Sequence, residues 1–286
     1  MRSPLLFLVG LIVLALNKIR YGLRGYKEPR PFSPTDFEQA SLYDRHVVNG
    51  WIKALHDYTG QKLEGKVVLE LGPGADLGPA LLLLEAGAKQ YFTVDANRLI
   101  DKTPLAFYES LLASCARSKE LLDEVRNTLA KRNGRIQYVV DPSFNLSALQ
   151  DRGIDLVVSQ AAFEHFSDVE KTIEQLSTVV HSGCTLVAEI DLMTHTGILR
   201  QRDPLNIYRF SPWLYRLARF SGIPNRVRPE SYKASLQKNG WYNVRVVPLQ
   251  TLSQQQVNEL RPGLAPSFKD DPDLHILSFL LLATKR

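Results

Sequence analysis

The chain has 286 residues, of which 44% are hydrophobic and 23% are charged, and its net charge is +5. This composition is that of a globular protein with a substantial core, and the two cysteines, Cys115 and Cys184, exclude a disulfide framework and a zinc-binding spacing. Much of the positive charge is concentrated between Lys18 and Arg30. We therefore expect a local basic patch and no nucleic-acid partner.

The first residues form an apolar segment. Residues 4–16 carry no charge, and this run is shorter than the roughly 20 residues that span a bilayer. It can extend to Tyr21 if Lys18 and Arg20 reach the membrane surface. We interpret residues 1–21 as a membrane anchor, with a helix packed on the domain and a cleaved secretory signal as alternatives. With an anchor, the basic residues that follow it should stay cytoplasmic.

Residues 22–35 are basic and contain three closely spaced prolines, which predicts an extended linker. From residue 34 to residue 58 apolar side chains recur with helical spacing, and Ser33 or Thr35 can cap the start of this helix. The globular part is therefore expected to begin near Asp36 and to include the rest of the chain, residues 36–286.

An apolar strand followed by a glycine turn is the most informative feature. Residues 67–71 predict a buried parallel strand, which contains an acid, Glu70, before a turn with Gly72 and Gly74. Glycines let a ligand lie close to the backbone. A helix over 77–87 and a second strand lead to Asp95, about 20 residues further on, where doubly wound folds hold a ribose diol. These residues predict a nucleoside-cofactor site at the carboxyl edge of a sheet.

Further strands alternate with helical segments. We expect strands over 91–94, 135–140, 154–159 and 184–190, and a long helix over 104–132. The last two strands, 243–248 and 275–283, have no helical crossover between them and should form an antiparallel pair at the sheet edge. The predicted fold is α/β, with a doubly wound, Rossmann-like sheet of seven strands, parallel except for an antiparallel final strand, and helices on both faces.

The glycine turn departs from the dinucleotide-binding fingerprint. The third glycine, Gly78, comes one position late, Pro73 occupies the middle of the turn, and Glu70 would repel a diphosphate. Strand, Glu-Leu-Gly-Pro-Gly, helix, strand and Asp instead resemble the first two motifs of class I S-adenosylmethionine (SAM)-dependent methyltransferases. The cofactor of that family carries an ammonium and a sulfonium in place of phosphates, which suits an acid at this position.

The resemblance implies a set of cofactor-binding residues. In this family, the glycine turn lines the methionine end of SAM, and the acid after the second strand holds the ribose hydroxyls. Asp141, after the third strand, would accept the adenine amino group, or it caps the turn at Pro142. The implied set is Glu70, Gly72, Gly74, Asp95, Asp141 and Gln160. No metal is expected, because four of the six histidines, at positions 46, 56, 181 and 275, have no ligand spacing with acids or cysteines.

Phe163-Glu164-His165 resembles the Glu-His pair that follows the fourth strand in many small-molecule methyltransferases. His165 is the candidate general base, because a neutral imidazole can take a proton from a hydroxyl near neutral pH. The alternative is that His165 caps or packs a helix and that alignment alone drives methyl transfer.

The segment over residues 191–233, called the cap segment below, lies where members of this family build a substrate cap. It is rich in arginines, which clamp carboxylates or phosphates, and in aromatic residues, whose apolar members we expect to pack on the core. The candidate substrate-binding residues are Arg200, Arg202, Arg209 and Arg226.

We therefore expect a membrane-associated SAM-dependent methyltransferase (EC 2.1.1.-) with a cytoplasmic catalytic domain. Its acceptor would be an oxygen of a polar or anionic small molecule or glycan, with a nitrogen or carbon acceptor as alternatives. The alternative is a non-catalytic protein of the same fold that docks a partner through its basic cap segment and anchor. A nicotinamide oxidoreductase is disfavoured by Gly78 and Glu70.

Overall fold

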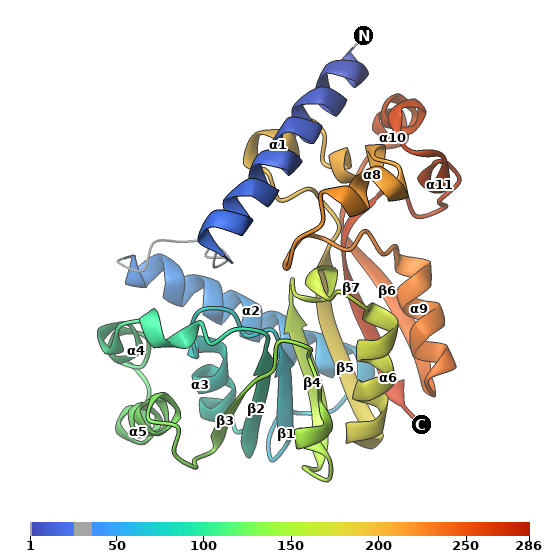
Figure 1. Cartoon of the computed structure of the whole chain (residues 1–286). Coiled ribbons are helices and arrows are strands. Elements are labelled where there is room, and N and C mark those ends of the chain that lie inside the picture. The colour runs from blue at the N-terminus through green and yellow to red at the C-terminus, as the bar shows by residue number, and fades with distance from the viewer. Residues whose placement is uncertain (1, 26–35) are drawn as a thin grey trace.

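A seven-stranded sheet forms the centre of the computed structural model, which describes residues 2–25 and 36–286 (Figure 1). The strands are β1 (Val67–Leu71), β2 (Gln90–Asp95), β3 (Ile136–Val140), β4 (Ile154–Gln160), β5 (Val180–Asp191), β6 (Trp241–Thr251) and β7 (Ile276–Lys285). Their order is β3-β2-β1-β4-β5-β7-β6; β7 pairs antiparallel with β5 and β6, and the other pairs are parallel. The predicted fold class, with its antiparallel final strand, is confirmed.

Helices cover both faces of the sheet (Figure 1). One face carries α2 (Phe37–Thr59), α3 (Gly78–Glu85), α4 (Leu105–Leu111) and α5 (Ser118–Leu129), and the other carries α6 (Val169–Val179) and α9 (Pro229–Lys238). The remaining helices are α1 (Arg2–Arg24), α7 (Gly197–Arg202), α8 (Pro212–Leu217), α10 (Gln254–Leu260) and α11 (Pro266–Lys269), with short 3-10 turns η1 (Ile100–Lys102), η2 (Ser147–Leu149), η3 (Phe163–His165), η4 (Asn206–Arg209) and η5 (Arg261–Gly263).

The uninterrupted apolar run of β1 follows from this layering. Successive strand residues point to opposite faces, so a strand covered on both sides needs apolar residues at consecutive positions. Val68 packs with the helices α2 to α5, and Leu69 packs with α6 and α9. All five residues of β1 are buried, and Glu70 is among them. Burial of the strand leaves its carboxyl end, with the glycine turn, as the place where a ligand can reach the backbone.

The helix predicted over 104–132 is two helices. α4 ends at Leu111, and the backbone N–H of Cys115 donates to the carbonyl of Leu112 at 2.9 Å in the turn that follows. The guanidinium of Arg117 then donates to the carbonyl of Leu84 at the end of α3 (3.1 Å). The chain turns between α4 and α5 so that α5 can pack beside α3, a tertiary contact that helical periodicity does not encode.

Two further boundaries differ from the prediction. α2 is capped by Asp36, whose side chain accepts the N–H of Gln39 at 3.1 Å, and Ser33 and Thr35 lie outside the described residues, as does most of the predicted linker. The connection between β6 and β7 contains α10 and α11, although the two strands pair antiparallel as expected. These helices pack beside the cap segment (Figure 1).

α1 lies against the cap segment and faces away from the molecule on its other side (Figure 1). Within Pro4–Arg24, the most apolar stretch of 18 residues has a mean hydropathy of 1.7, and only 11% of that stretch is buried. By length and composition it could be a membrane anchor or a signal sequence.

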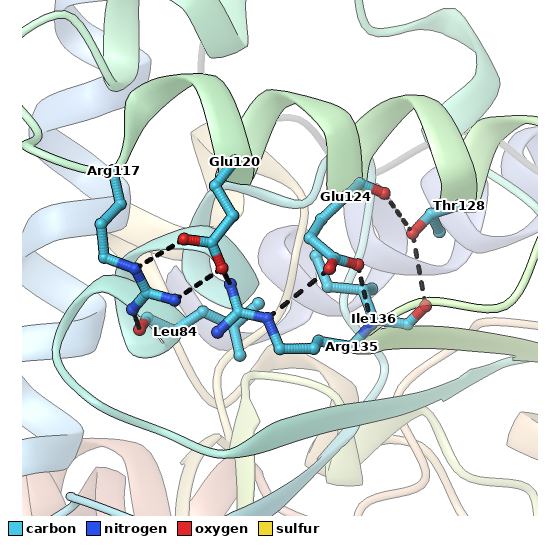
Figure 2. Close-up of polar contacts among 7 residues, drawn as sticks. All are labelled: Leu84, Arg117, Glu120, Glu124, Thr128, Arg135 and Ile136. Carbon is cyan, nitrogen blue, oxygen red and sulfur yellow. Dashed lines mark hydrogen bonds and ion pairs between the residues drawn. The ribbon is translucent and has the colours of Figure 1, made fainter.

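Figure 2 shows how α5 is held to the start of β3. The carboxylate of Glu124 accepts the backbone N–H of Arg135 at 2.7 Å and lies 3.5 Å from the Nε of Arg135. Glu120, one turn earlier, pairs with Arg117 and Arg135 nearer to solvent. The side chain of Glu124 is 13% exposed and that of Glu120 is 51% exposed. The more buried acceptor should contribute more to stability.

We predict that Glu124→Ala lowers the free energy of unfolding by about 1–2 kcal/mol, because it leaves the N–H of Arg135 without its acceptor. Glu120→Ala removes only exposed ion pairs and should cost less. Urea denaturation of both variants checks this order, and a larger loss for Glu120→Ala would contradict it.

Candidate functional site

A cavity of about 1120 Å³ opens at the carboxyl edge of the sheet. Its walls come from the turn after β1, the ends of β2 and β4, the helix α2, and the cap segment, and α1 contributes to its rim. The carboxyl ends of neighbouring parallel strands meet at one edge of a sheet, which is where open α/β sheets bind ligands.

Gly72 and Gly74 form the turn between β1 and the cavity. Both have positive φ angles, 74° and 75°. The N–H of Gly72 donates to the carbonyl of Val94 at 2.9 Å, and a Cβ at Gly72 would lie 2.5 Å from the Cβ of Ala162. Gly72 is therefore fixed by both its backbone conformation and its packing. No described atom lies within 4 Å of a Cβ built on Gly74, so this side of the turn is open to a ligand.

Glu70 lies beneath the turn and is 2% exposed. The hydroxyl of Tyr91 donates to its carboxylate. Burial raises the pKa of Glu70 well above its usual range, and the nearby charges of Asp76 and Asp95 raise it further. A cationic ligand beside this carboxyl would favour its ionised form, whereas a diphosphate would oppose it.

A second acid, Asp44, meets the turn from α2 and was missed in the sequence. It is 2% exposed, and burial followed by the charge of Asp76 raises its pKa to about 9. One of its oxygens, Oδ2, has no hydrogen-bond partner among the described residues. The signal was present in the sequence, because Asp44 occupies a position of the buried stripe of α2 that also contains Ala40 and Val47.

Asp95 ends β2 at the cavity wall. Its carboxylate accepts the N–H of Asn97 at 2.9 Å. Burial raises its pKa to about 6, and hydrogen bonds from backbone N–H groups offset part of that effect. With Asp44, Glu70 and Asp76, it gives this side of the cavity four carboxyl groups.

Asp141 and Gln160 have different positions relative to the cavity. Asp141 accepts the backbone N–H of Ser143 at 2.8 Å and its hydroxyl at 2.6 Å, so it caps the turn at Pro142. This turn contributes Pro142, Ser143 and Phe144 to the cavity wall, and Gln160 also lines the cavity. The structure thus shows the capping role of Asp141, and its contact with adenine stays a prediction.

Two histidines lie together in the cavity wall. The rings of His165 and His195 are 4.8 Å apart between centroids, and the Nε2 of His195 lies 4.0 Å from the Oε1 of the buried Glu164. Burial, followed by the charge of His195, lowers the pKa of His165 to about 4, and burial also lowers the pKa of His195. Both imidazoles are thus neutral near pH 7. The side chain of His195 is 35% exposed, and sequence reasoning did not single it out as a base.

Glu164, His165 and His195 offer ligand atoms that lie within 4.8 Å of one another. One carboxylate and two imidazoles are a donor set that a divalent cation can use. The expected absence of a metal therefore stays a prediction, which chelation can test.

Of the four predicted substrate arginines, Arg200 lines the cavity. Its guanidinium forms an ion pair with Asp191, at the end of β5, with an N–O distance of 2.6 Å. Arg202 is exposed at the end of α7. Arg200 is thus the member of the set that a substrate in the cavity can reach.

Arg209 and Arg226 form contacts within the cap segment. Arg209 is 2% exposed in its side chain and pairs with the fully buried Asp203 at 2.6 Å. The guanidinium of Arg226 lies 3.9 Å from the ring centre of Tyr215 and donates to the carbonyl of Phe210 at 2.7 Å. These contacts give both side chains a structural role, and their contact with substrate stays a prediction.

The model of one family, described as a methyltransferase domain, matches residues 43–246, which is well over half of the chain. The chain belongs to the methyltransferase domain family. The matched range contains the glycine turn, the four carboxyl groups and both histidines of the site. The predicted class I, SAM-dependent methyltransferase is confirmed, and SAM is its cofactor.

Several solved structures are similar to this methyltransferase. A SAM-dependent methyltransferase from Mesorhizobium loti is 15% identical, with a TM-score of 0.45, and the match covers 83% of this chain and 100% of that one. The YcgJ protein from Bacillus subtilis is 16% identical, with a TM-score of 0.45 and coverage of 85% and 99%. Phosphoethanolamine N-methyltransferase 2 from Haemonchus contortus, solved with SAM, is 14% identical, with a TM-score of 0.47 and coverage of 89% and 60%. No curated protein matches the chain.

The residues of the cavity fit SAM. The open face of Gly74 admits a ligand close to the backbone, and the buried carboxyls suit an ammonium and a sulfonium. Glu70, beside the glycine turn, would hold the ammonium, and Asp95, at the end of the next strand, would hold the ribose hydroxyls; both roles stay predictions from the family resemblance. Asp44 also lines this side of the cavity.

We predict that SAM affinity depends on the ionisation of Asp95. With a pKa of about 6, Asp95 is protonated below that pH and then loses acceptor strength for the ribose, so affinity should fall as pH falls through 6. If the ionised form alone binds, affinity at pH 5 is about tenfold lower than at pH 7. Calorimetric titration at several pH values measures this dependence. The Asp95→Asn variant should bind SAM weakly, and its affinity should not change with pH in this range. A dependence that persists in Asp95→Asn would assign the titration to another acid.

A second prediction separates a structural from a substrate role for Arg209. Arg209→Met leaves Asp203 buried without its cation and should lower the free energy of unfolding by about 3 kcal/mol, whereas Arg202→Met, at an exposed site, should change it little. Thermal or urea denaturation checks this. A fully stable Arg209→Met variant that loses turnover would instead identify Arg209 as a substrate contact.

Proposed function

We propose that this methyltransferase transfers the methyl group to an oxygen of a polar or anionic small molecule or glycan, and that it does so at a membrane with its catalytic domain in the cytoplasm. The observation that supports the acceptor class is the charge distribution in the cavity. Four carboxyl groups gather where β1 and β2 end, whereas Lys171 and Arg200 follow β4 and β5, where Asp168 and the two neutral histidines also line the cavity. The cavity thus has an anionic part and a mixed part that contains these two cations.

This distribution suits two ligands of opposite character. The carboxyl side holds the cofactor, whose sulfonium supplies an activated methyl group. Arg200 and Lys171 lie where an acceptor can enter, and a guanidinium with one partner, Asp191, still has donors for a carboxylate or phosphate. An anionic acceptor would be held by these cations and repelled by the carboxyl side, which sets its orientation in the cavity.

The histidines provide a place for the acceptor proton. We assign the base role to the imidazole pair, with His195 as the more exposed member and His165, the predicted base, buried beside it. His195 is neutral near pH 7 and can take the hydroxyl proton as the oxygen attacks. The charge of Asp191, which favours protonation of His195, can stabilise the charge that the ring acquires.

The test is formation of S-adenosylhomocysteine from SAM with a panel of hydroxylated carboxylates, sugar phosphates and glycans. We predict that His195→Gln lowers kcat at least about 100-fold and leaves SAM affinity unchanged. His165→Gln should have a smaller effect. Since a base is lost when it is protonated, the wild-type kcat at saturating SAM should stay level through neutral pH and fall only as pH drops toward the lowered histidine pKa values.

Dialysis against EDTA should leave this rate unchanged if the pair acts as a base. A rate that disappears with EDTA and returns with a divalent cation would make Glu164, His165 and His195 a metal site. Full activity of both histidine variants would leave alignment as the source of the rate.

A further inference from the structure

The outer face of α1 is an uncovered apolar stripe. Its residues are spaced three or four apart, which on a helix of 3.6 residues per turn places them in one sector of about 80°. The stripe consists of Leu5, Leu8, Ile12, Leu16, Ile19 and Leu23, whose exposures are 64%, 52%, 50%, 59%, 59% and 80%. Such a stripe along a whole helix is unusual for a surface in water.

The opposite face of α1 is packed on the cap segment along its length. The amide of Asn206 donates to the carbonyl of Leu6 at 3.0 Å, and a Cβ at Gly10 would lie 2.0 Å from the Oδ1 of Asn206. Near the other end of the helix, the ring of Tyr21 lies 5.2 Å from that of Phe220. These contacts extend over about 22 Å at 1.5 Å per residue. α1 is therefore a two-sided helix, with one side committed to this domain.

α8 carries apolar residues beside the stripe. Trp213 and Leu217 are 62% and 53% exposed, and the Nζ of Lys18 donates to the carbonyl of Leu217, which joins α8 to α1. The other two tryptophans, Trp51 and Trp241, are each 2% exposed. Tryptophan is favoured where a protein meets a membrane surface, because its ring is apolar and its N–H is polar.

The charges carried by α1 and by the stretch that contains α8 have one sign. Residues 2–25 contain no acid, and none occurs between Asp203 and Glu230. Lys18, Arg24 and Arg216 are exposed beside the apolar residues. Apolar residues bordered by cations complement a bilayer with anionic headgroups.

We propose that the stripe of α1 together with Trp213 and Leu217 is an interfacial membrane-binding surface, which lies in the plane of an anionic phospholipid bilayer and does not span it. A spanning α1 would carry the packed cap segment, with Arg216 and Arg219, into the hydrocarbon, where charged groups are costly. Otherwise it would have to leave the cap segment and expose the apolar residues that it covers. An interfacial α1 keeps its packed face on the cap segment and buries its apolar stripe in the bilayer surface.

This orientation has a consequence for the acceptor, which rests on the proposed function. Asn17, Arg20 and Tyr21 of α1 line the rim of the cavity. A bilayer on the outer side of α1 therefore lies next to the entrance, with a cation, Arg20, between the headgroups and the site. The acceptor class that fits is an amphipathic molecule whose polar or anionic head enters the cavity while its apolar part stays in the membrane.

The full-length protein should bind vesicles of phosphatidylcholine with phosphatidylglycerol more strongly than vesicles of phosphatidylcholine alone. Trp213 is a built-in reporter, because its emission should shift to the blue on binding and the shift should be absent in Trp213→Phe. The double variant Ile12→Glu/Leu16→Glu should bind at least tenfold more weakly. Val247→Glu/Leu249→Glu adds the same charge at exposed residues of β6 and is the matched control, which should bind like the wild type.

Topology separates the interfacial from the spanning arrangement. In sealed vesicles to which protein is added from outside, a cysteine at Pro4→Cys, in a Cys115→Ser background, should react with a membrane-impermeant maleimide. Protection of that cysteine until detergent is added would show a spanning helix and overturn the proposal. If the protein forms a stable dimer without lipid, and Ile12→Glu/Leu16→Glu converts it to a monomer, a second copy covers the stripe and the proposal is overturned.

Two measurements keep this proposal apart from the proposed function. SAM titration of Ile12→Glu/Leu16→Glu should match that of the wild type, so loss of vesicle binding with retained SAM affinity concerns the surface alone. A bimane label at Arg20→Cys should become less water-exposed on vesicle binding, whereas a label at Tyr242→Cys, at the start of β6, should not. Vesicle binding without a change at residue 20 would overturn the placement of the entrance at the membrane.

Discussion

Four carboxyl groups, three of them buried, share one side of the cavity, and much of the site depends on this constraint. Burial, and after it the like charges of the neighbouring carboxyls, raises the pKa of Asp44 and of Glu70. The fold accepts this cost at the end of β1, where buried strands also hold the glycine turn. A ligand with positive charge favours the ionised carboxylates, so binding of a cationic cofactor is expected to be coupled to the release of protons from this cluster.

A buried ion pair, Arg209 with Asp203, fixes the geometry of the cap segment. Asp203 accepts both from the guanidinium of Arg209 and from the amide of Asn206, and each of the three is at most 5% exposed. The same amide of Asn206 donates to the backbone of α1, beside Gly10. A buried ion pair contributes little net stability but fixes geometry, since any rearrangement would leave a charge unpaired. The amide of Asn206, held by this pair, therefore fixes one point of α1 on the cap segment, and the apolar contacts of Phe7, Leu11 and Leu14 extend this packing.

Sequence alone was sufficient for the features that depend on local patterning. The strand, glycine turn and Asp95 predicted the site, because the chain order of a parallel sheet brings strand ends to one edge. Sequence could mark Asp44 as an acid in the buried stripe of α2, but only tertiary packing shows that this stripe meets the glycine turn. Packing likewise brings His195 to Glu164 across the turn after β5. The arginines also show this limit, because the sequence does not separate a buried structural arginine from one that lines the cavity. Arg209 and Arg200 are alike in the sequence, and only packing buries one in an ion pair and leaves the other at the cavity.

The N-terminal helix shows why hydropathy could not decide between an anchor and a packed helix. A window average responds to the number of apolar residues and not to the side on which they lie. In α1, Gly10 and Leu14 face the cap segment, and Ile12 and Leu16, at intervening positions, face outward. Both kinds of residue raise the mean hydropathy equally, so the same mean hydropathy is expected for an anchor, a packed helix and a signal sequence. The close approach at Gly10 distinguishes these interpretations, because a methyl group at this position would collide with Asn206. A helix surrounded only by lipid would not require a glycine there. The packing of α1 on the cap segment and its apolar outer face are therefore two properties of one element, and they place the cavity entrance and the outer face of α1 on the same helix.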